Sequence, residues 1–408
     1  MPISEKLASF VEAVRGSGLL PNAEVDALAH AASQPDADPE PLARDLVQRK
    51  LLTAYQVRRL WKGRGPELFL NQYVLIDRLG EGGMGEVFKA RHTRLDRDVA
   101  LKVMRKEKMA NPEAVKRFRR EIRAAATLAH ENVVMAYDAD QSGDVHFFAM
   151  EFVDGTTLDR LVRDKDPLPV DEACDYIRQA ALGLQHAYEK GLTHRDVKPA
   201  NLLVDKNGVV KITDLGLVLV DPASGEVATQ ITREGLTVGT PDFVAPEQAR
   251  NPRAADVRAD IYALGCTLYY VLTGEVPFPG GTPTEKMLRH SRDTIPVPTR
   301  AEIGAGVLEV LAKMTARKPE QRYGTPAEVV AALEPFARRA GPPPTPPPLP
   351  TLTESLTADD LPTPPTAPPV DSRFQLPSKT DRPRARRAGC FGVVLVGLAV
   401  GVAIGRMV

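Results

Sequence analysis

Glycines at a spacing suited to phosphate binding lie close to residue 80. An apolar, strand-like run, Tyr73-Val74-Leu75-Ile76, leads to Gly80-Glu81-Gly82-Gly83-Met84-Gly85, and Val87 follows. Glycine has no Cβ, so backbone amides at these positions can approach phosphate oxygens closely. Two arrangements use this spacing: the first turn of a dinucleotide-binding fold and the glycine-rich loop that lies over ATP phosphates. The spacing alone indicates a phosphate-binding loop and leaves both arrangements open.

The residues after the glycines distinguish the two arrangements. A dinucleotide-binding turn needs a helix that begins at the last glycines. Residues 86–91 instead alternate apolar and polar side chains, as a strand does, and residues 98–103 form a second strand-like run. The pattern therefore favours a hairpin with the glycines at its tip. Lys102 lies on the second strand, and Glu121 lies on the charged, helical stretch of residues 112–130 that follows.

A denser group of chemically active side chains follows further along the chain. It is the run Thr193-His194-Arg195-Asp196-Val197-Lys198-Pro199-Ala200-Asn201. Asp214-Leu215-Gly216 begins 13 residues after Asn201, and Gly239-Thr240-Pro241 and Ala245-Pro246-Glu247 come next. In this order and spacing the chain resembles the eukaryotic-like (Hanks-type) serine/threonine protein kinases, and its motifs are worded as in the bacterial members. The resemblance covers residues from about 73 to 336.

The resemblance implies an α+β, bilobal protein-kinase fold with a small β-rich N-lobe and a larger helical C-lobe. It implies ATP and Mg²⁺ as cofactors, with Mn²⁺ as a possible substitute. Asn201 and Asp214 would hold the metal, which prefers hard oxygen ligands. Met150 would gate the back of the adenine pocket. By the same resemblance, the nucleotide would contact Leu79, Gly80, Glu81, Gly82, Gly83, Met84, Gly85, Val87, Ala100, Lys102, Met150, Glu151 and Val153.

The resemblance also assigns catalytic roles. Lys102 would hold the α and β phosphates, and Glu121 would orient it. Asp196 would position the acceptor hydroxyl and take its proton, while Lys198 would face the transferring phosphate. These roles suit phosphoryl transfer, which needs charge neutralisation and in-line positioning more than covalent chemistry.

Further residues match structural positions of the family. Asp260 resembles the buried aspartate that ties the catalytic loop to a central helix. Glu247 and Arg322 resemble the ion pair of the large lobe. Lys198-Pro199 is typical of serine/threonine rather than tyrosine kinases. Leu215 stands where many members carry Phe, and we expect it to fill the same apolar slot.

Arg195 precedes the predicted catalytic aspartate. Kinases with arginine there usually need a phosphate on the activation segment, which the arginine neutralises. The segment from Asp214 to Glu247 offers Thr229, Thr232, Thr237 and Thr240. We expect Thr240 to pack against the catalytic loop, which leaves Thr232 and Thr237 as equal candidates for phosphorylation.

Two classes of function remain to be compared: an active protein kinase, and a pseudokinase that acts as a scaffold or nucleotide-sensing module. Pseudokinases commonly lack the lysine, the loop aspartate or the metal aspartate. Lys102, Asp196 and Asp214 are all present, which favours an active enzyme. Residues 239–247 match the platform that docks peptides, so we expect protein substrates rather than small molecules.

Residues 1–66 predict a helical N-terminal module. Leu19-Leu20, Val25 and Leu28 recur as Leu51-Leu52, Val57 and Leu60, an offset of 32. The spacings suit helices with one apolar stripe, so each half reads as a helix, a turn and a second helix. A small bundle without chemistry and a partner-docking module both fit this pattern.

The C-terminal part differs in composition. Of 36 prolines, 12 lie between Pro342 and Pro369, so residues 341–388 predict an extended, disordered, basic linker. Residues 389–405 carry no charge and predict a transmembrane helix. Arginines before this span favour a cytoplasmic kinase domain. Gly397 and Gly401 could pack a homodimer for trans-autophosphorylation.

Overall composition excludes some classes. The 408 residues contain 53 Lys or Arg and 53 Asp or Glu, so the net charge is zero, which argues against a nucleic-acid partner. Three cysteines, of which Cys174 and Cys266 fall in helical patterns, suit a reducing compartment. The first residues lack the pattern of a signal peptide.

Overall fold

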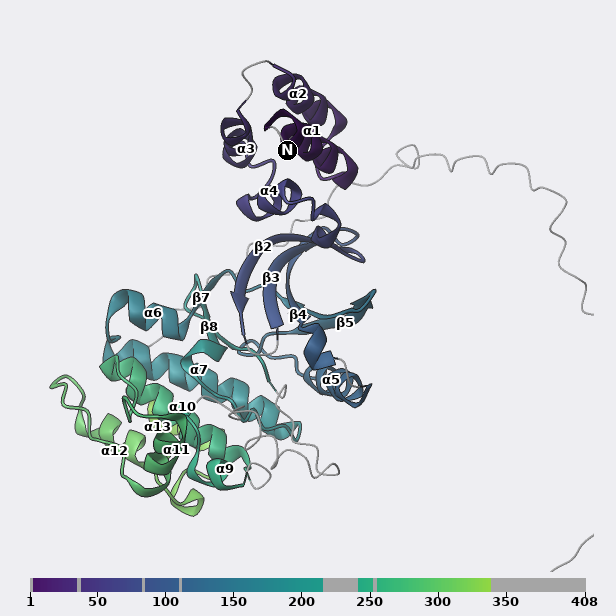
Figure 1. The fold of residues 1–408 in the computed structure, drawn as a ribbon. Helices are drawn as coiled ribbons and strands as arrows, with labels where there is room; N and C mark the ends of the chain where they lie inside the picture. The colour runs from purple at the N-terminus through teal and green to yellow at the C-terminus, as the bar shows by residue number, and fades with distance from the viewer. Residues whose placement is uncertain are drawn as a thin grey trace, which may run out of the picture. The chain divides into compact units, whose positions relative to one another are not determined.

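The structure, a computed structural model, describes six ranges of the chain: 3–34, 38–82, 85–109, 112–215, 241–251 and 255–338 (Figure 1). In these ranges no helix is both long and apolar enough to cross a membrane. The predicted linker, the predicted span and the four candidate threonines lie outside the described residues.

The N-terminal module consists, in its described part, of four helices: α1 (Ile3–Ser17), α2 (Asn22–Ala32), α3 (Pro39–Gln48) and α4 (Ala54–Trp61). This confirms the predicted pair of helix–turn–helix repeats. The repeated apolar positions are buried, Val25 and Leu28 in α2 and Val57 and Leu60 in α4. Asp38 and Thr53 cap α3 and α4, because each side chain accepts a hydrogen bond from a backbone amide of its first turn.

The N-lobe is built on a six-stranded antiparallel sheet with the order β1-β2-β3-β4-β6-β5. Its strands are β1 (Phe69–Leu70), β2 (Tyr73–Glu81), β3 (Gly85–His92), β4 (Arg97–Met104), β5 (Ala136–Ser142) and β6 (Val145–Glu151). The β2–β3 hairpin is the one predicted from the alternating pattern. Its ladder shifts register twice, between Leu75 and Asp77 and between Arg78 and Gly80.

The N-terminal module and this sheet share one hydrophobic core. Phe10 and Leu60 of the module belong to the same buried cluster as Tyr73, Phe88 and Phe147 of the sheet. Figure 1 shows the module against the sheet, on the side away from the helical lobe. The module is therefore packed as an extension of the N-lobe.

The C-lobe is mainly helical. Its helices are α6 (Leu158–Lys165), α7 (Val170–Glu189), α9 (Pro246–Arg250), α10 (Val257–Thr273), α11 (Pro283–Arg292), α12 (Ala305–Met314) and α13 (Pro326–Leu333). Nearly every residue of α10 is buried, as expected of a helix that is apolar all round. The helix ends where Gly274 takes a left-handed φ of 77°, which glycine adopts without a steric penalty.

Two further elements lie where the lobes meet. Helix α5 (Pro112–Ala125) carries Glu121. It ends five residues before residue 130, where the predicted helical stretch ends. A three-stranded sheet consists of β7 (Gly155–Thr157), which precedes the predicted catalytic loop, and β8 (Leu202–Asp205) and β9 (Val210–Ile212), which follow it. Because β8 and β9 pair as a hairpin, the residues just before β8 and just after β9 lie side by side.

Candidate active site

One buried carboxylate, that of Asp260, holds the backbone of the predicted catalytic loop (residues 193–201). Asp260 of α10 accepts hydrogen bonds from the amides of His194 and Arg195, each at 2.7 Å. Burial raises the pKa of Asp260, while the two amide hydrogen bonds oppose that shift by favouring the carboxylate. Arg195 has a φ of 66°, a strained value for a residue with a Cβ, so the two amide bonds hold a backbone turn that would otherwise relax. This confirms the role predicted for Asp260.

Two predicted catalytic side chains, Asp196 and Lys198, meet the predicted metal ligand Asn201 next to this turn. Lys198 Nζ lies 2.7 Å from Asp196 Oδ2. Asn201 Nδ2 donates to the Asp196 carbonyl at 2.8 Å and to Asp196 Oδ2 at 3.2 Å. The side chains of Asp196 and Lys198 are 16% and 22% exposed, so both reach solvent from a fixed position. Asp196 is thus oriented by an ammonium group and an amide and can accept a proton from an incoming hydroxyl.

Lys102 reaches from the N-lobe to the metal-motif aspartate. Its Nζ lies 2.7 Å from Asp214 Oδ1, and Lys102 is only 7% exposed. The pairing with Glu121 stays a prediction, because the Glu121 side chain lies outside the part that the structure describes. The contact that is seen joins two residues 112 positions apart and draws the two lobes together at the centre of the site.

The residues predicted to hold a metal fit that task. The Thr213 amide donates to the Asn201 carbonyl at 3.0 Å, so Asn201 and Asp214 are neighbours at the open end of the β8–β9 hairpin. They supply an amide oxygen and a carboxylate. Mg²⁺ is usually bound by one or two such oxygens together with substrate phosphates and water. The donor set therefore suits a magnesium–nucleotide complex.

The glycine loop closes the β2–β3 hairpin. Gly82 and Gly85 exchange backbone hydrogen bonds of 2.8 and 3.3 Å, and Gly83 and Met84 at the tip lie outside the described residues. A Cβ on Gly85 would stand 2.0 Å from the Val103 carbonyl oxygen. This last glycine is therefore required by the close approach of β4, in addition to any contact with phosphate.

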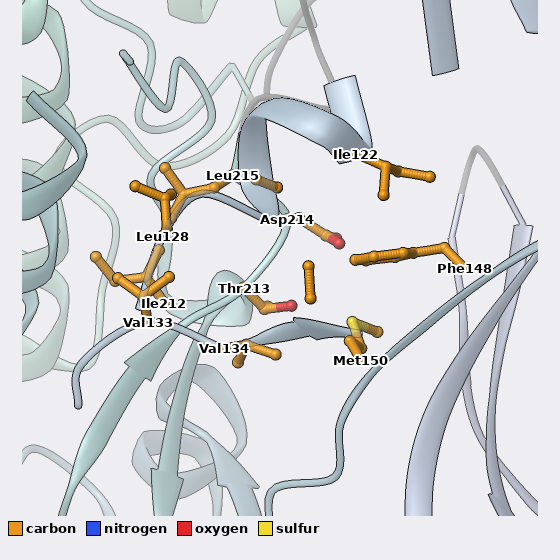
Figure 2. A pocket seen from close by; sticks show the side chains of 12 residues that line it. Ile122, Leu128, Val133, Val134, Phe148, Met150, Ile212, Thr213, Asp214 and Leu215 are labelled. Atoms are coloured by element: carbon orange, nitrogen blue, oxygen red, sulfur yellow. The ribbon is translucent and has the colours of Figure 1, made fainter. Parts of the chain in front are cut away.

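The predicted adenine-pocket residues lie on paired strands. Ala100 pairs with Met150 across β4 and β6, and both are buried. Val87 lies on β3, and Leu79 of β2 is half exposed. Behind Met150 a cavity of about 20 Å³ lies between α5, β6 and the metal motif (Figure 2). Leu215 is 7% exposed and lines this cavity, so it fills the apolar slot as expected.

Glu151 is held by a partner that the sequence did not reveal. Lys211 of β9 pairs with Glu151 at 3.0 Å, and Glu151 also accepts a hydrogen bond from the Met135 amide at 3.2 Å. The adjoining hinge residue, Val153, is partly buried. Lys211 and Glu151 are 60 positions apart, and no spacing rule joins them. This ion pair fixes the start of the hinge between the lobes.

Two more unpredicted contacts support the site. Gln248, the residue that follows Glu247 in the sequence, donates a hydrogen bond to the Arg195 carbonyl at 2.6 Å. Lys286 of α11 pairs with Asp242 at 2.5 Å. The ion pair of Glu247 and Arg322 is present as predicted, with two contacts of 2.7 and 2.8 Å and an Arg322 side chain that is fully buried.

Comparison of the sequence with known proteins points to the same family as the arrangement of these residues. Residues 73–333, more than half of the chain, match the family described as "Protein kinase domain". The chain therefore belongs to the protein kinase family.

Its relatives are bacterial serine/threonine-protein kinases, which confirms the resemblance. It is 40% identical over 274 residues to serine/threonine-protein kinase PknB of Mycobacterium tuberculosis (strain H37Rv), a match that covers 66% of this chain and 43% of that protein. PknB of Mycobacterium leprae matches to the same extent. Serine/threonine-protein kinase PrkC of Bacillus subtilis is 34% identical over 265 residues, which covers 64% of this chain and 40% of that protein. The chain spans less than half the length of these relatives.

Proposed function

We propose that this chain is an active serine/threonine protein kinase that transfers the γ-phosphate of ATP to hydroxyl groups of proteins. The observation that carries the proposal is the set of contacts around Asp196. The Lys198 ammonium group and the Asn201 amide hold its carboxylate at 2.7 and 3.2 Å.

The residues would divide the work as follows. The Asp196 carboxylate orients the acceptor hydroxyl in line with the γ-phosphorus. It takes the hydroxyl proton as the new P–O bond forms and the bond from the γ-phosphorus to the bridging oxygen breaks, with ADP as the leaving group. Lys198 lies beside that carboxylate and neutralises charge on the transferring group. Mg²⁺, held by Asn201 and Asp214, would neutralise phosphate charge when the nucleotide is bound. Lys102, which pairs with Asp214 at 2.7 Å, would bind the α and β phosphates.

Phosphate incorporation from labelled ATP tests this proposal. The purified full chain should label itself or a generic protein substrate in the presence of Mg²⁺. Asp196→Asn should lower the rate by at least about a thousandfold, because it removes the proton acceptor and part of the positioning. Lys102→Met should have a similar effect through loss of phosphate binding. Asp144→Asn is the matched control, since Asp144 is 88% exposed and lies in the turn between β5 and β6.

An unlabelled wild type under these conditions would instead favour the pseudokinase reading. Nucleotide binding without transfer would identify a nucleotide-sensing module, and no binding would identify a scaffold.

We further propose that the kinase is activated by its own phosphorylation on Thr232 or Thr237. Arg195 supports this. Its Nε is buried and has no hydrogen-bond partner among the described residues, so a phosphate could supply one. A phosphothreonine adds about −1.5 to −2 charges and three acceptor oxygens, and it can order a loop on an arginine.

The apolar residues 389–405 support a proposed C-terminal membrane anchor with the kinase domain in the cytoplasm. Seventeen residues would span roughly 26 Å as a helix, the short end of what a bilayer needs. Deleting residues 389–408 should move the protein from the membrane pellet to the supernatant, and persistent pelleting of that variant would reject the anchor. The homodimer that Gly397 and Gly401 would form stays part of this proposal.

A further inference from the structure

The start of helix α4 lies against strand β2. Thr53 and Gln56 form a capping box there. Thr53 Oγ1 accepts a hydrogen bond from the Gln56 amide at 3.2 Å, and Gln56 Oε1 accepts one from the Thr53 amide at 3.0 Å. Such a box satisfies two amides at a helix start and needs no further partner.

The same two side chains also donate outward, to the backbone of β2. The Thr53 hydroxyl donates to the Ile76 carbonyl at 2.5 Å, and Gln56 Nε2 donates to the Leu75 carbonyl at 2.9 Å. Gln56 is only 7% exposed, a rare burial for a glutamine. Each side chain thus uses its acceptor to start α4 and its donor to hold β2.

The carbonyls they hold lie at an irregular point of the sheet. Leu75 pairs with Ala90 and Asp77 pairs with Lys89, so Ile76 is an extra residue in β2 without a partner in β3. A bulge of this kind leaves backbone groups outside the ladder and bends the strand. Those groups need other partners when they are partly buried, and Thr53 provides one.

The second register shift of β2 lies between Arg78 and Gly80, and Leu79 is its extra residue. A bulge re-aims the side chains beyond it. The module therefore fixes the first of two bends in a strand, and the second bend is the one that carries Leu79 and the glycines over the predicted nucleotide site.

We call the contact of α4 with strands β2 and β3 the N-lobe junction, and apolar packing adds to its hydrogen bonds. The ring of Tyr55 lies 5.7 Å from that of Phe88 on β3, and the Tyr55 hydroxyl accepts a hydrogen bond from Arg59 at 3.0 Å. Helix α4 thus contacts both strands of the hairpin. Because interiors are closely packed, a shift of α4 is passed on to β2 and β3.

We propose that Thr53 and Gln56 are positioning residues for phosphoryl transfer: they fix the β2 bulge at Ile76 and thereby set the placement of the glycine loop over ATP. The inference rests on the proposed function of that loop as the cover of the ATP phosphates. It assigns the N-terminal module a part in nucleotide affinity.

The test compares variants of the full chain by KM for ATP, kcat and the directly titrated affinity for ATP. Thr53→Val and Gln56→Leu keep the side-chain size and remove both the donor to β2 and the acceptor of the capping box. Each should weaken nucleotide affinity and raise KM by about threefold to tenfold, which corresponds to the free energy of the one hydrogen bond that holds β2, with kcat unchanged at saturating ATP. Thr53→Ser keeps the hydroxyl and should restore wild-type KM.

Thr282→Val is the matched control. Thr282 forms the same kind of capping box with Glu285 on α11 of the C-lobe. Its loss should lower the melting temperature as Thr53→Val does, but leave KM for ATP at the wild-type value. Equal KM values for the wild type, Thr53→Val and Gln56→Leu would overturn the inference and leave the proposed function standing. Failure of the wild type to bind ATP would overturn both.

Hydrogen exchange of the unaltered protein gives a second readout that does not depend on folding of a variant. Coupling between two sites is reciprocal, so ATP should slow amide exchange in peptides that cover residues 53–60. Unchanged exchange there, with slower exchange in the glycine loop, would contradict the proposed link.

Discussion

The two halves of the active site are held by different kinds of contact. In the C-lobe, the buried carboxylate of Asp260 accepts two amide hydrogen bonds from the catalytic loop. In the N-lobe, the neutral side chains of Thr53 and Gln56 donate to two carbonyls of β2. Hydrogen bonds to charged groups are about twice as strong as neutral ones. The loop that carries the predicted catalytic aspartate is therefore held more firmly than the strand that leads to the glycine loop, which would admit and release the nucleotide in the proposed function.

Removal of the Asp260 carboxylate should have the largest effect. Asp260→Ala leaves the buried amide of His194 and the partly buried amide of Arg195 without an acceptor and lets the strained turn at Arg195 relax. We expect the free energy of unfolding to fall by roughly 3–6 kcal/mol, about 1.5–3 for each charge-assisted bond, and phosphoryl transfer to be lost. Chemical denaturation measures the first effect and ATP-dependent labelling the second. Wild-type stability of this variant would remove the distinction between the lobes.

Acid should lower the stability of the folded protein through a buried histidine of the C-lobe. His290 of α11 is fully buried, between the Tyr262 hydroxyl at 2.7 Å and the Asp242 carbonyl at 3.1 Å. Burial lowers its pKa from 6.5 to about 4. The folded state therefore disfavours the protonated ring, so this contribution to stability is complete above pH 6.5 and is lost as the pH falls toward 4.

This histidine should lower the free energy of unfolding by up to roughly 3 kcal/mol between pH 7 and pH 4. Denaturation at several pH values measures the slope. His290→Gln cannot titrate, so its slope over this range should be shallower than that of the wild type. Parallel slopes would show that other groups govern the acid response.

Substitution at the N-lobe junction should change the free energy of unfolding least. Gln56→Leu removes two neutral hydrogen bonds, the one that Nε2 donates to the Leu75 carbonyl and the one that Oε1 accepts from the Thr53 amide, which together cost about 2 kcal/mol of unfolding free energy. The junction has no titratable group at its two donors, so this loss should be the same at pH 7 and pH 5. A loss that grew with acidity would mean that a charged group contributes to the junction.

Much of the helical-lobe half of the site could be predicted from the sequence. Asp260, Glu247 and Arg322 were placed by the order of motifs, and the structure confirms their contacts. The apolar spacing predicted the four helices of the module, and the alternation after the glycines predicted the β2–β3 hairpin.

The N-lobe junction could not be predicted. Thr53 and Gln56 have the spacing of a capping box, which indicates a helix start but not what else the two side chains bind. Their second partners depend on an extra residue at Ile76, and a single-residue bulge leaves no periodic signal in an alternating run. The ion pair of Lys211 and Glu151 likewise joins distant residues of ordinary surface type.

Mass spectrometry of the full chain after incubation with Mg²⁺ and ATP tests the central claim most directly. We predict phosphate on Thr232 or Thr237 of the wild type and of Asp144→Asn, and none on Asp196→Asn prepared in the same way. Equal phosphorylation of the wild type and Asp196→Asn would show that another enzyme adds the phosphate. No phosphate on any of the three, and none on an added protein substrate, would contradict the assignment of an active kinase.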